Sequence, residues 1–327
     1  MYIDFHCDTL MLTWENIPGE NVIENTKYHL DLKSLVETKV KAQFFAIYML
    51  QPSDFTELQR PVVDDREYIY SLAKDLQDGV SQVHEMEMAY SWEDYKKNLS
   101  LGKTSCFLTI EDGRYLTNPE KIREVYELGV RLVSITWNFP NALGYPNSTD
   151  PKKMEKGLTS WGRDAISLMN DLGILIDVSH LSDGGFWDII KYSKKPILAS
   201  HSNARAITNH PRNLTDDMIK TIGNKGGIIG LNFSPTFLNE KNPSPGEKNR
   251  VSRIEDMILH LHHIKNKGGI ETLALGTDFD GVSGYLEIDC PQKYESLCEA
   301  MKKGGFTERE IDMFLYKNGE RFLRDTL

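Results

Sequence analysis

The sequence has few of the features that mark membrane, secreted or disulfide-rich proteins. No apolar run approaches the ~18 residues of a membrane-spanning helix. The first residues carry no basic segment followed by an apolar stretch, so we expect no secretory signal. The 327 residues include only four cysteines, none in a Cys-x-x-Cys pair, which indicates reduced thiols. These absences predict a cytoplasmic protein that does not insert into a membrane.

Positive charge is also scarce. The chain has 38 Lys and Arg against 48 Asp and Glu, which gives a formal net charge of −10. This balance argues against a nucleic-acid-binding surface and against binding to anionic membranes. It leaves the substrate open, because a binding site has its own local field. The sequence is compatible with a monomer or a homodimer.

Internal repeats, low-complexity tracts and interdomain linkers are missing as well, which predicts a single domain over residues 1–327. What recurs is a short β-branched or aromatic run followed by a helical stretch. Eight such runs occur, at Tyr2–His6, Ala42–Tyr48, Ser105–Ile110, Leu132–Thr136, Gly173–Val178, Pro196–Ser200, Gly227–Leu231 and Leu273–Gly276. Most are nearly continuously apolar, as is typical of parallel strands covered by helices.

The stretches between these runs are amphipathic, and several end at a glycine. Helices are predicted over Asn118–Leu128, Ser160–Leu172, Ser182–Tyr192, Thr215–Asn224 and Ser252–Lys267. The terminating glycines are Gly129, Gly173, Gly226 and Gly268. Strand followed by helix, eight times, predicts a (β/α)8 TIM-like barrel. A doubly wound sheet is the alternative, but it would need a topological switch point that the sequence does not show.

Polar side chains gather where five of the predicted strands end. These segments read His6-Cys7-Asp8, Glu111-Asp112-Gly113, Asp177-Val178-Ser179-His180, Ser200-His201-Ser202 and Gly276-Thr277-Asp278-Phe279-Asp280-Gly281. The carboxyl ends of barrel strands meet at one mouth, so histidines and carboxylates from five strands aim at a common volume. Burying that many such groups together without a cation would be costly.

The constellation therefore predicts a pair of metal ions. His6 and Asp8 lie two residues apart on one strand, point to the same face and can hold one ion. His180 and His201 come from adjacent strands and can hold a second ion, and Glu111 can bridge both ions with its two oxygens. Imidazole and carboxylate ligands without thiolate suit Zn²⁺, and also Mn²⁺, Fe²⁺ or Co²⁺.

Each of these residues alone has a simpler interpretation. A single strand-end histidine more often caps a loop than binds a metal, and Glu111 or Asp278 alone could cap a helix. Agreement among five strands favours the metal site. We expect a solvated helix face for His260, His262 and His263, and a packing role for Cys7. We assign no role in the metal site to His29, His84 or His210, because none of them lies at the end of a predicted strand.

Taken in order, the five segments resemble the membrane (renal) dipeptidase family of zinc peptidases, and the resemblance covers nearly the whole chain. His-x-Asp on the first strand is the discriminating feature, because the wider amidohydrolase superfamily typically has His-x-His there. The resemblance implies a binuclear zinc site on a TIM-like barrel. One zinc would bind His6 and Asp8, the other would bind His180 and His201, and Glu111 would bridge them.

The resemblance also implies roles toward a dipeptide substrate. Asp278 matches the family's acid/base aspartate, and Arg212 matches the arginine that binds the terminal carboxylate of the substrate. A guanidinium offers a planar fork to a carboxylate; apart from the resemblance, a surface ion pair would be the better interpretation of Arg212. The implied reaction is dipeptide hydrolysis by a metal-bridging hydroxide, with tolerance of a D-residue at the C-terminal position.

One position departs from the family pattern. The family member from kidney has a histidine after the fourth strand, thought to help stabilise the oxyanion, where this chain has Trp137. Tryptophan has a single donor, its indole N–H. Either Asn138 or a metal takes over the oxyanion, or Trp137 walls the pocket and the substrate range differs.

Two other functions stay open. One is a binuclear hydrolase acting on a lactone, phosphoester or cyclic amide, and the other is a non-catalytic metal-binding barrel, against which Asp278 argues. The long segments Pro140–Thr159 and Ser234–Val251 follow two strands at the same mouth. We expect them to shape side-chain pockets and to close as lids.

Overall fold

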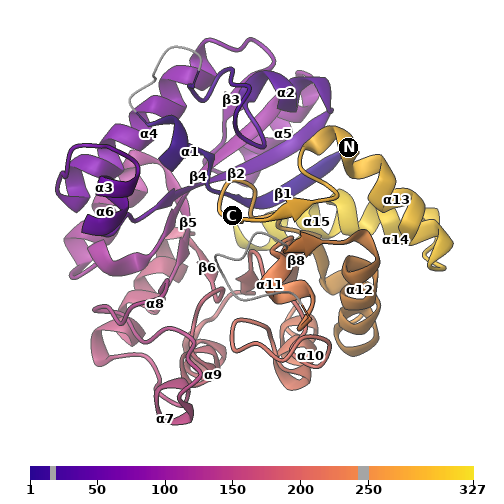
Figure 1. Cartoon of the computed structure of the whole chain (residues 1–327). Helices are drawn as coiled ribbons and strands as arrows, with labels where there is room; N and C mark the ends of the chain where they lie inside the picture. The colour runs from indigo at the N-terminus through magenta and orange to yellow at the C-terminus, as the bar shows by residue number, and fades with distance from the viewer. Residues whose placement is uncertain (15–19, 242–249) are drawn as a thin grey trace.

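The computed structural model describes residues 1–14, 20–241 and 250–327, and a closed ring of parallel strands lies at its centre (Figure 1). The ring consists of β1 (Tyr2–Cys7), β2 (Val40–Tyr48), β4 (Thr104–Glu111), β5 (Val130–Ser134), β6 (Leu175–Asp177), β7 (Leu198–Ala199), β8 (Ile228–Leu231) and β10 (Leu273–Leu275). β1 pairs with both β10 and β2, and the pairing of β2 with β4 completes the ring. The predicted TIM-like barrel is confirmed, because an open doubly wound sheet would leave its first and last strands unpaired.

Helices surround the strands on the outside (Figure 1). The long ones are α4 (Asp65–Ser81), α5 (Trp92–Ser100), α6 (Pro119–Leu128), α8 (Ser160–Leu172), α9 (Asp183–Tyr192), α10 (Asp216–Asn224), α12 (Ile254–Gly268), α13 (Tyr294–Lys303) and α15 (Asn318–Thr326). Shorter ones are α1 (Thr9–Thr13), α2 (Leu32–Glu37), α3 (Pro52–Glu57), α7 (Pro151–Met154), α11 (Pro235–Leu238) and α14 (Glu308–Asp312). The five predicted helices are confirmed to within two residues, and Gly129 and Gly173 end two of them in the left-handed conformation.

The barrel buries apolar side chains on both of its faces. One cluster fills the layer between strands and outer helices and includes Cys7, whose predicted packing role is confirmed. A second cluster joins alternate strand residues, among them Phe5, Phe44 and Phe107, to Phe322 of α15. Phe44 stacks on Phe5 and on Phe107 with ring centroids 4.8 and 4.5 Å apart. The barrel is therefore a packed core that leaves its carboxyl-end mouth as the place for a site.

The two long segments at the mouth carry short elements. Pro140–Thr159 contains α7, and Ser234–Val251 contains α11 and the start of β9 (Val251–Ser252), while residues 242–249 of it lie outside the described residues. β9 pairs with β11 (Tyr285–Leu286) in a small parallel sheet of its own, and a further short strand, β3 (Met86–Met88), pairs with β4. In the part of the chain that the structure describes, no helix is long and apolar enough to cross a membrane.

The interpretation of His260 as part of a solvated helix face is wrong. Its side chain is fully buried under the loop that follows β7. Its Nδ1 accepts a hydrogen bond from the backbone N–H of Ala204 at 3.0 Å, and its Nε2 lies 3.0 Å from the carbonyl oxygen of Leu238. Helix periodicity predicted the helix, but the position of this loop over α12 depends on tertiary packing.

Candidate metal and substrate site

The five strand ends bring their polar side chains together at the mouth of the barrel. His6 lies in β1, Asp8 directly follows it, and Glu111 is the last residue of β4. His180 and His201 follow β6 and β7 closely. All five residues are buried, with exposed fractions between 0 and 9%. Asp278, which follows β10, is 8% exposed and joins the same group.

Glu111 lies at the centre of this group. Its Oε1 is 3.1 Å from Nε2 of His180 and 3.2 Å from Nε2 of His201. Its Oε2 is 3.6 Å from Nε2 of His6. The same Nε2 of His6 also lies 3.5 Å from Asp8 Oδ2 and 3.7 Å from Asp278 Oδ1. The donor atoms thus form two overlapping groups, one of His6, Glu111 and His201 and one of His6, Asp8 and Asp278.

Hydrogen bonds behind the site fix the tautomer of His201. They determine that its Nε2 presents a lone pair to Glu111. The Ser200 hydroxyl donates its hydrogen to Asp177 Oδ2 at 2.7 Å. The same hydroxyl lies 2.7 Å from Nδ1 of His201 and therefore accepts from it. His201 then carries its proton on Nδ1 and leaves Nε2 free to bind a cation. This is the usual outer-shell arrangement of a metal-binding histidine.

His180 is oriented in a similar way. Its Nδ1 donates to Asn138 Oδ1 at 3.4 Å, which leaves the Nε2 lone pair toward Glu111. The Nε2 atoms of His180 and His201 are only 3.1 Å apart. Two lone pairs facing one another beside a carboxylate repel unless a cation lies between them.

Several buried atoms of the group lack a hydrogen-bond partner among the described residues. They are both ring nitrogens of His6, Oδ1 of Asp8 and Oε1 of Glu111. Buried polar atoms of a folded protein are nearly always satisfied. Nitrogen and carboxylate oxygen atoms that converge without donors between them fit a metal of the zinc type.

The pKa shifts of these residues also favour a bound cation. Burial lowers the pKa of His6, but the carboxylates of Asp8 and Glu111 outweigh burial and raise this pKa to about 10. Burial raises the pKa of Glu111 well above its usual range and that of Asp278 to about 7. A bound cation would replace the protons that these carboxylates otherwise attract.

The backbone is strained at the same place. His180 and Asp278 have φ values of +65° and +63°, and Asp280 has +70°, in the left-handed region that residues other than glycine seldom adopt. Such conformations persist where the surrounding structure holds them and cluster at functional sites. The predicted ligand His180 and the predicted acid/base Asp278 thus occupy two of these positions.

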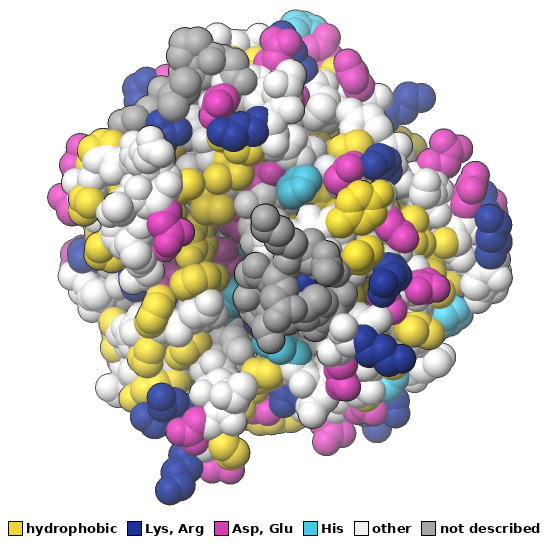
Figure 2. Space-filling model, viewed as in Figure 1, with side chains coloured by type: hydrophobic (Ala, Val, Ile, Leu, Met, Phe, Trp, Pro, Cys, Tyr) yellow, Lys and Arg dark blue, Asp and Glu magenta, His cyan; other side chains and the backbone are white. Residues whose placement is uncertain are grey.

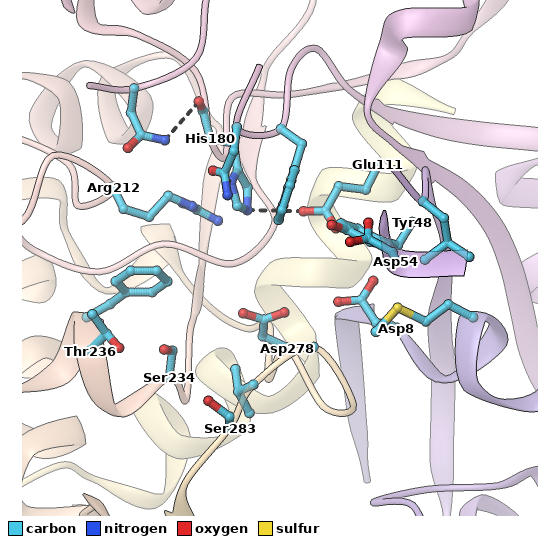
Figure 3. Close-up of a pocket in the computed structure, with 18 of the residues that line it drawn as sticks. Asp8, Tyr48, Asp54, Glu111, His180, Arg212, Ser234, Thr236, Asp278 and Ser283 are labelled. Carbon is cyan, nitrogen blue, oxygen red and sulfur yellow. Dashed lines mark hydrogen bonds and ion pairs between the residues drawn. The ribbon is translucent and has the colours of Figure 1, made fainter. Parts of the chain in front are cut away.

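A cavity of about 500 Å³ opens above the group. In Figure 2 the mouth is hollowed beside a band of hydrophobic side chains. Figure 3 shows Arg212 on one side of the cavity and Asp54 and Tyr48 on the other, with Glu111 and Asp278 between them. The metal group therefore lies near the middle of the cavity, within reach of a small substrate that spans it.

Arg212 is a buried wall residue, so the surface ion pair that would be expected apart from the resemblance is wrong. It is 4% exposed, and its Nη1 and Nη2 donate to Ser202 Oγ at 2.6 Å and to the His201 carbonyl at 2.8 Å. Its Nε has no partner among the described residues. The guanidinium is therefore held in place at the wall of the cavity.

Trp137 and Asn138 both line the cavity. The ring of Trp137 lies edge-on to Tyr48 with centroids 4.9 Å apart and lies 6.2 Å from the ring of His180. Trp137 therefore forms a wall, while Asn138 orients His180.

Sequence reasoning missed several residues of the site. Asn232 donates to Asp278 Oδ2 at 2.8 Å, and it directly follows β8, the same strand-end signal that identified the other residues. His29 is tied to Asp280, whose N–H donates to His29 Nδ1 at 2.9 Å. No periodicity or motif marks His29, because its loop reaches the mouth only in the folded chain.

Comparisons with known proteins agree with this geometry. A model of the family described as membrane dipeptidase (peptidase family M19) matches residues 1–326. The dipeptidase tcpJ of Claviceps purpurea is 28% identical over 330 residues, which cover 99% of this chain and 73% of that protein.

Two solved structures share the fold. The crystal structure of a metallopeptidase from Rhodobacter sphaeroides, liganded with a phosphinate mimic of the dipeptide L-Ala-D-Ala, is similar with a TM-score of 0.85 at 24% identity, covering 100% of this chain and 99% of that one. The metallopeptidase called dipeptidase AC has a TM-score of 0.83 at 25% identity, covering 99% and 98% of the two chains.

Proposed function

The chain belongs to the membrane dipeptidase family, and on this basis we propose that it hydrolyses dipeptides with a pair of zinc ions at the mouth of its barrel. The family supports metal-dependent hydrolysis of dipeptides. The choice of zinc and the number of two ions rest on the donor set of this chain, imidazole and carboxylate without thiolate.

We assign one ion to His6 and Asp8, the other to His180 and His201, and the bridging position to Glu111. The observation that carries this proposal is the approach of the two Nε2 atoms to within 3.1 Å of one another beside Glu111 Oε1. With the proton of each imidazole on Nδ1, neither Nε2 has a hydrogen to donate to the other or to Glu111. When bound, two zinc ions would supply an activated water and polarise the peptide carbonyl.

Asp278 is proposed as the residue that moves the proton. It is 8% exposed and lines the cavity, and Asn232 holds its Oδ2 so that Oδ1 faces the metal group. From there its carboxylate can take a proton from the attacking water and deliver it to the leaving amine. Trp137 walls the cavity beside Tyr48, and Asn138 keeps His180 oriented.

Arg212 is proposed to bind the terminal carboxylate of the dipeptide. Its guanidinium is anchored by Ser202 and His201 and lines the cavity, and its planar fork suits a carboxylate. With that carboxylate on Arg212 and the scissile bond at the metals, the N-terminal residue lies toward Asp54. We further propose a cytoplasmic location, which the four free cysteines support.

The test compares each dipeptide with its C-terminal amide in wild type and Arg212→Lys. Wild type should cleave the free acid with a kcat/KM roughly 10–100-fold higher, because a charged hydrogen bond contributes about 1.5–3 kcal/mol. Arg212→Lys should lose most of this preference, because lysine cannot form the bidentate contact. If wild type cleaves acid and amide equally, a free carboxylate is not recognised, and a lactone, phosphoester or cyclic amide becomes the better substrate class.

A further inference from the structure

A second arginine, Arg250, lines the cavity and has no role in the function proposed above. It directly precedes β9, and its carbonyl accepts a hydrogen bond from the N–H of Tyr285 at 2.8 Å. The pairing of β9 with β11 therefore fixes its backbone. Only 5% of its surface is exposed, so the guanidinium has little contact with water.

Among the described residues, this guanidinium has no charge partner. Its one hydrogen bond to a described residue joins Nη1 to Ser283 Oγ at 3.4 Å, and its Nε has no partner there. Among residues 1–14, 20–241 and 250–327 it forms no ion pair, and burial alone lowers its pKa. Arg212 differs, because the carboxylates of Asp278, Asp177 and Glu111 act on it.

The two arginines belong to one side of the cavity, and α11 links them. Phe237 of α11 lies 5.6 Å from the guanidinium carbon of Arg212. Pro235, at the start of α11, packs beside Gly284, where an added Cβ would lie 3.2 Å from Cβ of Arg250 and 3.3 Å from Pro235. Figure 3 shows Ser234 and Thr236 on the side of Arg212. Arg250 and Arg212 therefore both border the cavity on the side of α11.

A buried cation is costly unless an anion accompanies it. The terminal carboxylate of a dipeptide supplies one anion, and Arg212 takes it in the proposed function. We propose that Arg250 binds a second carboxylate, the side chain of a C-terminal aspartate or glutamate. The preferred substrates are then dipeptides with an acidic C-terminal residue. This inference rests on the proposed function and names the substrate class of the same site.

The experiment measures kcat/KM of the metal-loaded enzyme for Ala-Asp against Ala-Asn and for Ala-Glu against Ala-Gln, with the C-terminal residue in both configurations. Each pair differs in charge and hardly in shape. Wild type should prefer the acid roughly 10–100-fold. Arg250→Gln should bring the ratio close to one, and Arg250→Lys should keep part of it. Arg253→Gln is the matched control, because Arg253 lies in the same segment outside the cavity, and it should keep the wild-type ratio.

Three results would overturn the inference. Equal cleavage of acid and amide by wild type would show that no side-chain carboxylate is bound, and this result needs no variant. An equal loss by Arg250→Gln on all four substrates would assign Arg250 to the terminal carboxylate that every dipeptide carries. Failure of the wild type to cleave any dipeptide would instead overturn the proposed function, and the inference with it.

Discussion

At the scale of single residues, the mouth of the barrel is crowded with groups that oppose one another. Glu111, Asp8 and Asp278 are three buried carboxylates around one imidazole, His6. A cation bound among these three carboxylates would neutralise their mutual repulsion. Their close approach to one another is therefore what a metal site requires. Gly281 shows how little room is left, since a Cβ at this position would lie 2.0 Å from Asp8 Oδ2 and 2.6 Å from Asp278 Oδ1.

Gly281→Ala should therefore weaken metal binding without unfolding the protein. The added methyl group pushes the carboxylate of Asp8 away from His6, and displaced ligands typically cost 10–100-fold in metal affinity or activity. The measurement is a metal titration of chelator-treated protein, followed by dipeptide hydrolysis. Gly144→Ala is the control, because its Cβ first meets the flexible end of Leu158 at 3.2 Å, and it should bind metal as wild type does. Equal affinity in Gly281→Ala and wild type would contradict the placement of Asp8 in the metal site.

At the scale of elements, α12 supports the substrate wall through its buried histidine. His260 is bonded to Ala204 and Leu238, which belong to the loop after β7 and to α11. The loop carries Arg212, and α11 carries Phe237 beside it. The neutral imidazole satisfies both backbone groups, because it offers one acceptor and one donor.

This arrangement predicts a stability that is sensitive to acid. Burial lowers the pKa of His260 from 6.5 to about 4 in the folded protein, so the unfolded chain binds its proton more tightly. His260 therefore makes its full contribution to the free energy of unfolding above about pH 6.5. This contribution, at most on the order of 3 kcal/mol, is lost as the pH falls toward 4. Urea unfolding at several pH values should show a weaker decline between pH 6.5 and 4.5 in His260→Gln than in wild type.

The exposed His84 provides the control for this prediction. His84→Gln removes an imidazole from the surface and should leave the decline unchanged. A decline in His260→Gln as steep as that of wild type would show that other groups cause the acid sensitivity.

At the scale of the whole molecule, bound metal should stabilise the barrel, because its proposed ligands come from the ends of four strands. Metal at 1,000 times its dissociation constant adds about 4 kcal/mol, which corresponds to roughly 5–10 °C in melting temperature for a domain of this size. Thermal melts before and after chelation should differ by this amount, and added Zn²⁺ should restore the higher value. Identical melting temperatures before and after chelation would contradict the claim that bound metal stabilises the barrel.

The barrel could be predicted from the sequence because its pattern is regular. Apolar runs recur eight times, with amphipathic stretches and terminating glycines between several of them, and all eight predicted strands belong to the observed ring. The short strands β3, β9 and β11 were not predicted, because they lie outside the eight apolar runs of the repeating pattern.

The convergence of the site residues could be predicted for the same reason, since barrel geometry brings strand ends together whatever the loops do. The groups around them could not. The burial of His260, the lack of a charge partner for Arg250 among the described residues and the contact of His29 with Asp280 all depend on how loops pack against one another. No local pattern in the sequence encodes these contacts.

The central claim, a binuclear zinc dipeptidase, is tested most directly by elemental analysis of protein purified without chelator, paired with hydrolysis of L,L- and L,D-dipeptides by wild type and Asp278→Asn. We expect about two zinc-like ions per chain in both proteins. We expect turnover by wild type and a loss of roughly 10²–10⁴-fold in the variant, because Asp278 moves the proton. Protein without bound metal, or a variant as active as wild type, would contradict the account.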